Sequence, residues 1–136
     1  MISCYELGHQ PAGLRFPLAF LRRAGFDPIV WDLAAGQTVD PDAFARARFV
    51  GISVPMHTAL RLGVQIARMI RSINPGCHIC FYGLYAWLNE SYLLGDLANS
   101  VLGGEFEELL VRLVETIQIC RIVKLPNGRM LLTFKT

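Results

Sequence analysis

The sequence lacks long hydrophobic runs and a targeting segment. No stretch of the 136 residues approaches the roughly 18 consecutive apolar residues that a membrane-spanning helix requires. The N-terminus also lacks a basic segment followed by a hydrophobic stretch and a cleavage site. We therefore expect a cytoplasmic protein with no membrane partner.

Charged residues are also scarce. They make up 18% of the chain, and the net charge is only +2. Neither a basic block nor interleaved aromatic residues are present, so nucleic acid is not an expected partner. The arginines are expected mostly on solvent-facing sides of helices: Arg15, Arg22, Arg23, Arg61, Arg68 and Arg71.

Cysteine is limited to four residues, at positions 4, 77, 80 and 120. They lie mostly in apolar, strand-like segments, where a reduced cysteine behaves as a small hydrophobic residue. A disulfide framework is therefore not expected. Cys77 and Cys80 form a lone Cys-x-x-Cys, but residues three apart on a strand point to opposite faces, so we assign no metal ligands.

Apolar residues, by contrast, make up 53% of the chain, which suits one domain whose sheet is covered on both faces. Apolar segments with strand character alternate with amphipathic segments. The expected strands are Ile2–Leu7, Pro28–Leu33, Phe49–Val54, Cys77–Tyr82 and Ser100–Leu102. The expected helices start near Arg15, at Pro41–Arg46, His57–Ile73, within Leu84–Leu94 and at Glu105–Ile119. This alternation predicts a doubly wound, flavodoxin-like (Rossmann-like) α/β domain over residues 1–119, with five parallel strands in the order 2-1-3-4-5.

The remaining residues, 120–136, have a different character. Two β-prone segments, Cys120–Leu125 and Arg129–Phe134, flank Pro126-Asn127-Gly128, and Asn-Gly strongly favours a hairpin turn. A two-stranded hairpin is only marginally stable alone. We therefore expect it to pack on the domain or on a second copy, which makes a homodimer through this extension a hypothesis.

The carboxyl ends of parallel strands meet at one edge of such a sheet, and ligands bind there. The candidate ligand-binding residues at these ends are His9, Gln10, Ser53, Met56, His57, Tyr82, Gly83, Tyr85, Gly103 and Gly104. His9 and His57 could hydrogen-bond a ligand, although His57 could equally do no more than begin a helix. The tyrosine rings could form a wall for a flat ligand or pack the loop onto the sheet.

The same edge does not suggest a reaction. Glu105, Glu107 and Glu108 follow Gly103-Gly104 and disfavour a phosphate there. No nucleophile and base, and no pair of carboxylates, are expected to converge at the strand ends, so we predict no catalytic residues and no enzyme activity.

Four segments resemble a known family: Ile2–Leu14, Phe49–Leu62, Ile73–Ala86 and Gly103–Glu107. They are similar to the N-terminal cobalamin-binding-type domain of certain radical S-adenosylmethionine proteins, over residues 1 to about 118. The resemblance implies a corrin ring on the carboxyl edge of the sheet, with its nucleotide tail threading into the domain.

The family pattern is only partly kept. Ser53 keeps the serine that follows the third strand, and Gly83 keeps one glycine of the motif after the fourth. In the Asp-x-His-x-x-Gly motif after the first strand, Glu6, Gly8 and Pro11 stand at the three conserved positions, and His9 is one position off. No lower cobalt ligand is therefore assigned.

The chain also lacks the Cys-x-x-x-Cys-x-x-Cys motif and the catalytic barrel of those proteins. The leading interpretation is a non-catalytic, cobalamin-binding accessory domain, with a radical S-adenosylmethionine protein as a possible catalytic partner. The alternative is a ligand-free, flavodoxin-like interaction or dimerisation module. A small flavodoxin-type enzyme is the least favoured interpretation.

Overall fold

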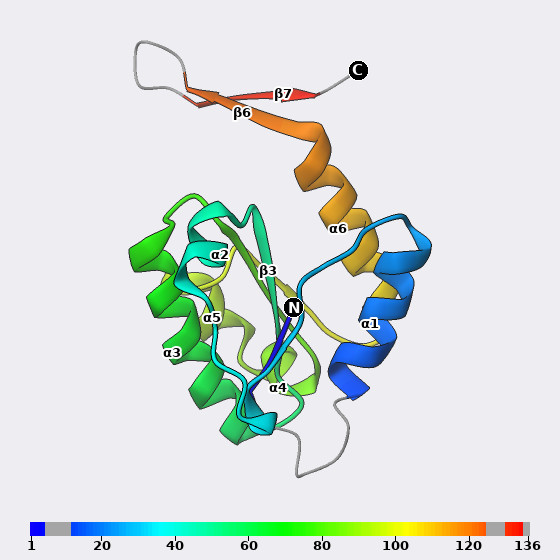
Figure 1. Cartoon of the computed structure of the whole chain (residues 1–136), viewed down its shortest axis with the longest axis vertical. Helices are drawn as coiled ribbons and strands as arrows, with labels where there is room; N and C mark the ends of the chain where they lie inside the picture. Colours follow the sequence, from blue (N-terminus) through cyan, green and yellow to red (C-terminus); the bar gives the residue numbers. More distant parts are fainter. Residues whose placement is uncertain (5–11, 125–129, 135–136) are drawn as a thin grey trace.

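The computed structural model describes residues 1–4, 12–124 and 130–134. Its central element is a parallel sheet of five strands in the order β2-β1-β3-β4-β5, which confirms the predicted fold class (Figure 1). The strands are β1 (Ile2–Ser3), β2 (Trp31–Asp32), β3 (Phe49–Ser53), β4 (His78–Tyr82) and β5 (Ser100–Leu102).

Helices cover both faces of this sheet. On one face lie α1 (Ala12–Arg23) and α6 (Glu107–Ile119). On the other face lie α2 (Pro41–Arg46), α3 (His57–Ile73), α4 (Leu84–Leu88) and α5 (Glu90–Asp96), and a short 3-10 helix, η1 (Leu33–Ala35), follows β2. Figure 1 shows α1 and α6 on one side of β3, with α3 and α5 on the other.

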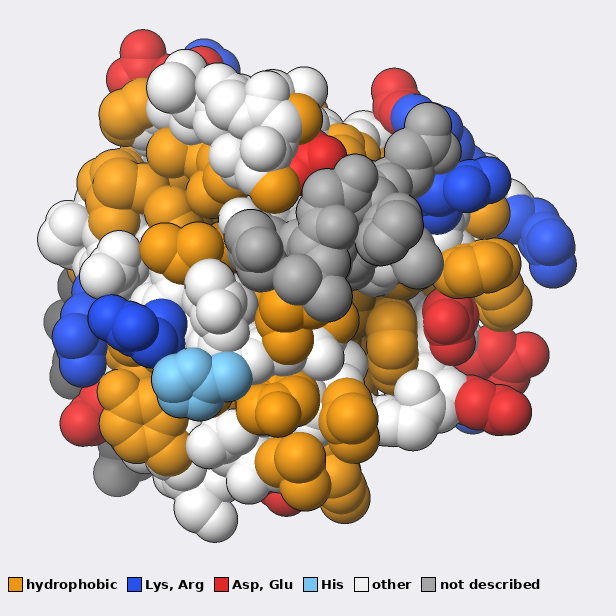
Figure 2. Space-filling view, turned by 90° about the horizontal axis from the view of Figure 1, so that it is seen from below, with side chains coloured by type: hydrophobic (Ala, Val, Ile, Leu, Met, Phe, Trp, Pro, Cys, Tyr) orange, Lys and Arg blue, Asp and Glu red, His pale blue; other side chains and the backbone are white. Residues whose placement is uncertain are grey.

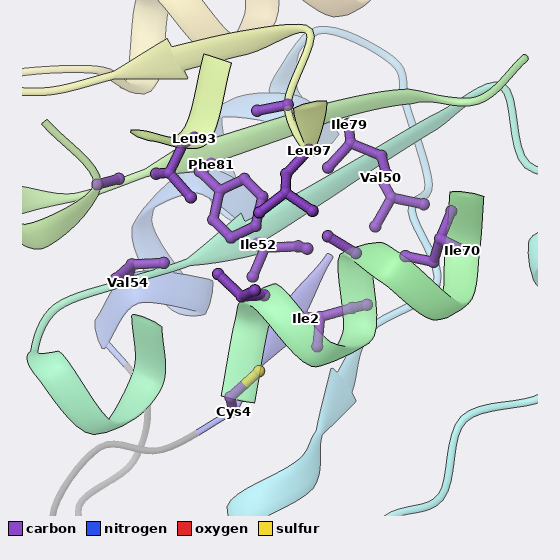
Figure 3. Close-up of a cluster of buried hydrophobic side chains, with 14 of the residues drawn as sticks. Ile2, Cys4, Val50, Ile52, Val54, Ile70, Ile79, Phe81, Leu93 and Leu97 are labelled. Carbon is purple, nitrogen blue, oxygen red and sulfur yellow. The ribbon is translucent and has the colours of Figure 1, made fainter. Parts of the chain in front are cut away.

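Alternation along the strands builds two core clusters. On β4, Ile79 and Phe81 point toward α3, while Cys80 and Tyr82 point toward α1 and α6. This is the period of two that a pleated strand imposes. Figure 3 shows the cluster on the α3 side, where Ile52 of β3 lies among these buried side chains. The high apolar content of the sequence therefore supplies two core clusters, one on each face of the sheet.

Some element boundaries differ from the predicted ones. β1 ends at Ser3 rather than Leu7, and residues 5–7 lie outside the described residues. α6 begins at Glu107 instead of Glu105. The segment after β4 contains two helices rather than one, since the chain bends at Asn89 (φ −117°, ψ 23°).

The C-terminal segment contains β6 (Cys120–Lys124) and β7 (Met130–Phe134), which pair antiparallel in a separate two-stranded sheet. The turn expected at residues 126–128 lies outside the described residues, so its geometry stays a prediction. Dimerisation through this segment and the boundary at residue 119 also stay predictions. Within the part of the chain that the structure describes, no helix has both the length and the apolar character that crossing a membrane requires.

Candidate functional site

The candidate site lies where the chain leaves β1 and β3 in opposite directions. After β1 it continues to α1 on one face of the sheet, and after β3 it continues to α3 on the other. The two strands are neighbours and run parallel, so this is the topological switch point at which open α/β sheets bind ligands. Figure 2 looks at the molecule from below the view of Figure 1, and hydrophobic side chains gather on this face beside one histidine.

Two buried serines lie side by side at this switch point. Ser3 pairs in register with Ser53, and their side chains are only 1% and 2% exposed. Both lie on the face covered by α1 and α6, because Ser53 is also in register with Tyr82 of β4. On the other flank of Ser3 stands Asp32, whose carboxylate accepts a hydrogen bond from the Ala34 N–H at 3.1 Å.

Among the buried side-chain nitrogen and oxygen atoms of the described residues, only the hydroxyl oxygen of Ser3 lacks a hydrogen-bond partner. Its Oγ is buried and has no hydrogen-bond partner. A buried polar atom left in this state costs about 1–3 kcal/mol of folding free energy. Such an atom in a native fold requires an explanation, and a bound ligand would provide one.

Tyr82 packs beneath α1 instead of facing a ligand. Its side chain is fully buried, and its ring lies 4.8 Å from the ring of Phe106. Its hydroxyl donates to the Gly13 carbonyl at 2.6 Å. Proline lacks the N–H that would bond to this carbonyl in a regular helix, and Pro17 stands four residues after Gly13. Tyr82 thereby supplies a hydrogen bond that Pro17 cannot, and fixes α1 above the serines.

Gly83 holds three strand ends together. Its φ of +109° is one that side-chain-bearing residues rarely adopt, and an added Cβ would lie 2.9 Å from the Val54 carbonyl oxygen. Its N–H donates to the Leu102 carbonyl at 3.0 Å, while the Tyr85 N–H donates to the Val54 carbonyl at 3.2 Å. The half-buried Tyr85 packs against the cluster on the α3 side. These bonds keep the edge compact beside the serine pair.

The two glycines after β5 have different surroundings. An added Cβ on Gly103 would lie 2.7 Å from Cβ and Cγ of Trp87, so the Trp87 side chain covers this residue. Gly104 has open space around the equivalent position. Nearby, Glu105, Glu107 and Glu108 line a hollow of about 390 Å³ together with Phe20. The acidic lining agrees with the expectation that phosphate is disfavoured here.

The remaining predicted site residues lie at the rim or outside the described residues. Met56 is half-buried before α3, and its carbonyl accepts the Leu60 N–H at 3.1 Å. His57 is the first residue of α3 and is exposed. His9 and Gln10 lie outside the described residues. The structure thus brings together Ser53, Gly83 and the loop before His57.

Ser3 was missing from the sequence prediction. A serine inside the apolar segment that begins the chain was the available signal, but its importance depends on its register with Ser53, which only the folded sheet reveals. An unpartnered hydroxyl is a property of three-dimensional packing, and no sequence pattern carries it.

The cysteines of Cys-x-x-Cys do not converge. Cys77 belongs to the cluster on the α3 side and Cys80 to the cluster on the α1 side. Burial raises the pKa of Cys77 to about 11 and that of Cys80 to about 12, so both thiols stay protonated at neutral pH. Over the described ranges, no group of three or more His, Cys, Asp or Glu residues is arranged to hold a metal ion.

The described residues fit the organic part of a corrin ligand better than its metal. Serine hydroxyls can hydrogen-bond the polar tail of such a ligand, and the Ser3 hydroxyl has no competing partner. Leu84, Trp87 and Leu88 of α4 expose apolar surface that a macrocycle could cover. No cobalt ligand is assigned to the chain. Comparison with protein-family models, with curated proteins and with solved structures finds no match.

Proposed function

We propose that this chain is a non-catalytic domain of the cobalamin-binding type, with the ligand held at the carboxyl edge between β1 and β3. The observation that carries the proposal is the buried Ser3 hydroxyl, which has no partner and lies in register with the buried Ser53. The resemblance to the cobalamin-binding-type domain of radical S-adenosylmethionine proteins supports the same ligand class.

In this proposal the chain binds and orients, and the cofactor carries the reactive chemistry. Ser3 and Ser53 hydrogen-bond the polar tail of the ligand under α1. The backbone hydrogen bonds of Gly83 and Tyr85 keep the ends of β3, β4 and β5 close together beneath the ligand. Met56 and His57 stand at the rim. A radical S-adenosylmethionine protein is the proposed catalytic partner, because this chain lacks the cysteine motif for an iron–sulfur cluster.

A ligand-free interaction module is the second candidate function. The observation that favours it is the exposure of three large apolar residues on α4, Leu84, Trp87 and Leu88, at 61%, 54% and 66%. Contiguous apolar surface of this kind is typical of protein-binding faces. In this case the apolar face contacts another protein directly, and no corrin is needed.

Retention of hydroxocobalamin distinguishes the two functions. The full chain is mixed with hydroxocobalamin, free ligand is removed, and the visible spectrum is recorded. The cobalamin-binding proposal expects retained corrin absorbance. A protein that emerges without corrin absorbance contradicts the proposal for this chain and leaves the interaction module as the better explanation.

The substitution Ser3→Ala tests the observation itself. Removing an unsatisfied buried hydroxyl is expected to raise the free energy of unfolding of the free protein by about 1 kcal/mol. The same change removes a ligand contact, so hydroxocobalamin retention is expected to fall. Ser91→Ala, at an exposed serine of α5, is the matched control and should leave retention unchanged. Equal retention by the Ser3→Ala variant and wild type would remove the basis of the proposal.

A further inference from the structure

A second cleft lies at the opposite edge of the sheet, where the strands begin. Its volume is about 370 Å³, which falls within the range of about 300–1,000 Å³ typical of small-molecule sites. It is lined by Met1, the end of α1 and the loop that follows, Trp31 of β2, α2 and the residue after it, the start of β3, and the last turns of α6. Neither Ser3 nor Ser53 lines this cleft.

The walls of this cleft are mainly apolar and partly aromatic. Trp31 and Phe44 lie with ring centroids 5.2 Å apart and planes inclined by 55°, and Phe26 and Phe49 line the same space. Ile29 also lines it, yet 63% of its side chain is exposed. A ligand that covers this exposed side chain removes apolar surface from water, which stabilises the complex.

Met1 lines the cleft and adds no charge to it at neutral pH. Its buried amino group donates a hydrogen bond to the Ile29 carbonyl at 2.9 Å. Burial lowers its pKa to about 5, despite an opposing effect of Cys77, so it is uncharged near pH 7. An apolar group can therefore lie beside Met1 without removing a charge from water.

The polar groups of the cleft favour an anion. Asp27 lies 3.9 Å from the guanidinium of Arg22, which offsets its charge. Arg46, in the last turn of α2, also lines the cleft and has no ion-pair partner among the described residues. A guanidinium without a partner beside apolar walls suits a ligand with an acidic head and an apolar body.

We propose that this cleft binds a small amphiphilic monoanion, with its aromatic or aliphatic body against the half-buried Trp31 ring and its acidic group at Arg46. The ligand is distinct from the corrin of the proposed function, because a corrin is too large for this volume and the two sites lie at opposite edges of the sheet. Ligand binding in this cleft can therefore be measured independently of ligand binding at the carboxyl edge.

Binding of decanoate to the full chain tests this inference. In a Trp87→Phe background, Trp31 is the remaining tryptophan, so its emission reports on the cleft. Decanoate is expected to shift this emission saturably, and to displace the fluorescent probe 1-anilinonaphthalene-8-sulfonate. The response is measured without hydroxocobalamin and does not require it, which keeps the outcome separate from that of the proposed function.

Two substitutions locate the site. Arg46→Gln is expected to weaken decanoate binding about tenfold, equivalent to about 1.4 kcal/mol. Ala43→Phe places a ring in the cleft and should abolish the response, with its fold checked by circular dichroism. Arg61→Gln, at an exposed arginine of α3 away from the cleft, is the control and should bind normally. The inference is overturned if Trp31 emission does not respond to millimolar decanoate, or if Arg46→Gln binds as tightly as wild type.

Discussion

At the scale of single residues, His78 illustrates how packing determines the role of a histidine. It begins β4, where its Nε2 shares a hydrogen bond with Ser100 Oγ at 2.9 Å. Its ring stacks on Phe49 with centroids 5.9 Å apart and planes inclined by 22°. Burial, followed by the positive charge of Arg71, lowers the pKa of His78. The residue is therefore neutral and structural at physiological pH.

This lowered pKa predicts a loss of stability on acidification. The unfolded chain protonates His78 near its ordinary pKa of 6.5, whereas the folded chain resists protonation until lower pH. Stability is therefore present above pH 6.5 and is lost as the pH falls below it. Chemical unfolding at about pH 7.5 and about pH 5.5 should show a smaller difference for His78→Gln than for wild type.

Burial lowers the pKa of the Met1 amino group to about 5, so its protonation on acidification also destabilises the folded protein. Wild type and the His78→Gln variant share this contribution, so the comparison between them isolates the effect of His78. His57→Gln is the matched control, because its side chain is exposed at the start of α3. The interpretation of His78 is wrong if His78→Gln keeps the full pH dependence of wild type.

Arg71 marks the limit of prediction at this scale. The sequence placed it with other arginines on solvent-facing sides of helices, but its guanidinium donates to the carbonyls of Pro75, Cys77 and Leu97 and to the Asn99 side chain. It therefore fastens the end of α3 to the strands that follow. These partners come from two separate segments, 75–77 and 97–99, so the spacing of arginines along the helix could not indicate them.

At the scale of elements, Gly83 links β4 to its neighbours. Substitution by alanine places a Cβ 2.9 Å from the Val54 carbonyl oxygen and requires a φ near +109°. We expect Gly83→Ala to lower the free energy of unfolding by about 3 kcal/mol. Chemical denaturation of the full chain measures this change.

A second glycine provides the control for this substitution. Gly95 lies in α5, has no positive φ, and has nothing within 4 Å of an added Cβ. Gly95→Ala should therefore stabilise the protein by about 0.5–1 kcal/mol through helix propensity. Similar effects of the two substitutions would contradict the role assigned to Gly83.

Elements differed in how well the sequence predicted them. α3 occupies the expected residues His57–Ile73, because its apolar residues recur with helical period over four turns and a proline and a glycine follow it. β1 and β2 are shorter than expected, since pairing with a neighbouring strand limits them to two residues each. The helical repeat of apolar residues is visible in the local sequence, whereas the length of a strand depends on the neighbouring strand with which it pairs.

At the scale of the whole molecule, the order of the strands followed from alternation of strands and helices, because right-handed crossovers leave few possible topologies. The general position of the candidate site followed from the same rule. Its key residue did not, because the Ser3 hydroxyl is unsatisfied only once β1 lies beside β3 and α1 lies over both. Long-range assembly creates this feature, and assembly is absent from a linear sequence.

Whole chains are expected to associate through their C-terminal strands. β6 and β7 form a two-stranded sheet separate from the main one, and a sheet of two strands is only marginally stable in water by itself. Pairing with the same segment of a second copy would extend it and satisfy its edges. Sedimentation of the full chain is therefore expected to show a dimer, and a chain ending at residue 119 should sediment as a monomer with an unchanged circular dichroism spectrum for the α/β domain. If the full chain is also a monomer at concentrations of about 100 μM, where even a micromolar dimer would be populated, the hairpin does not mediate association.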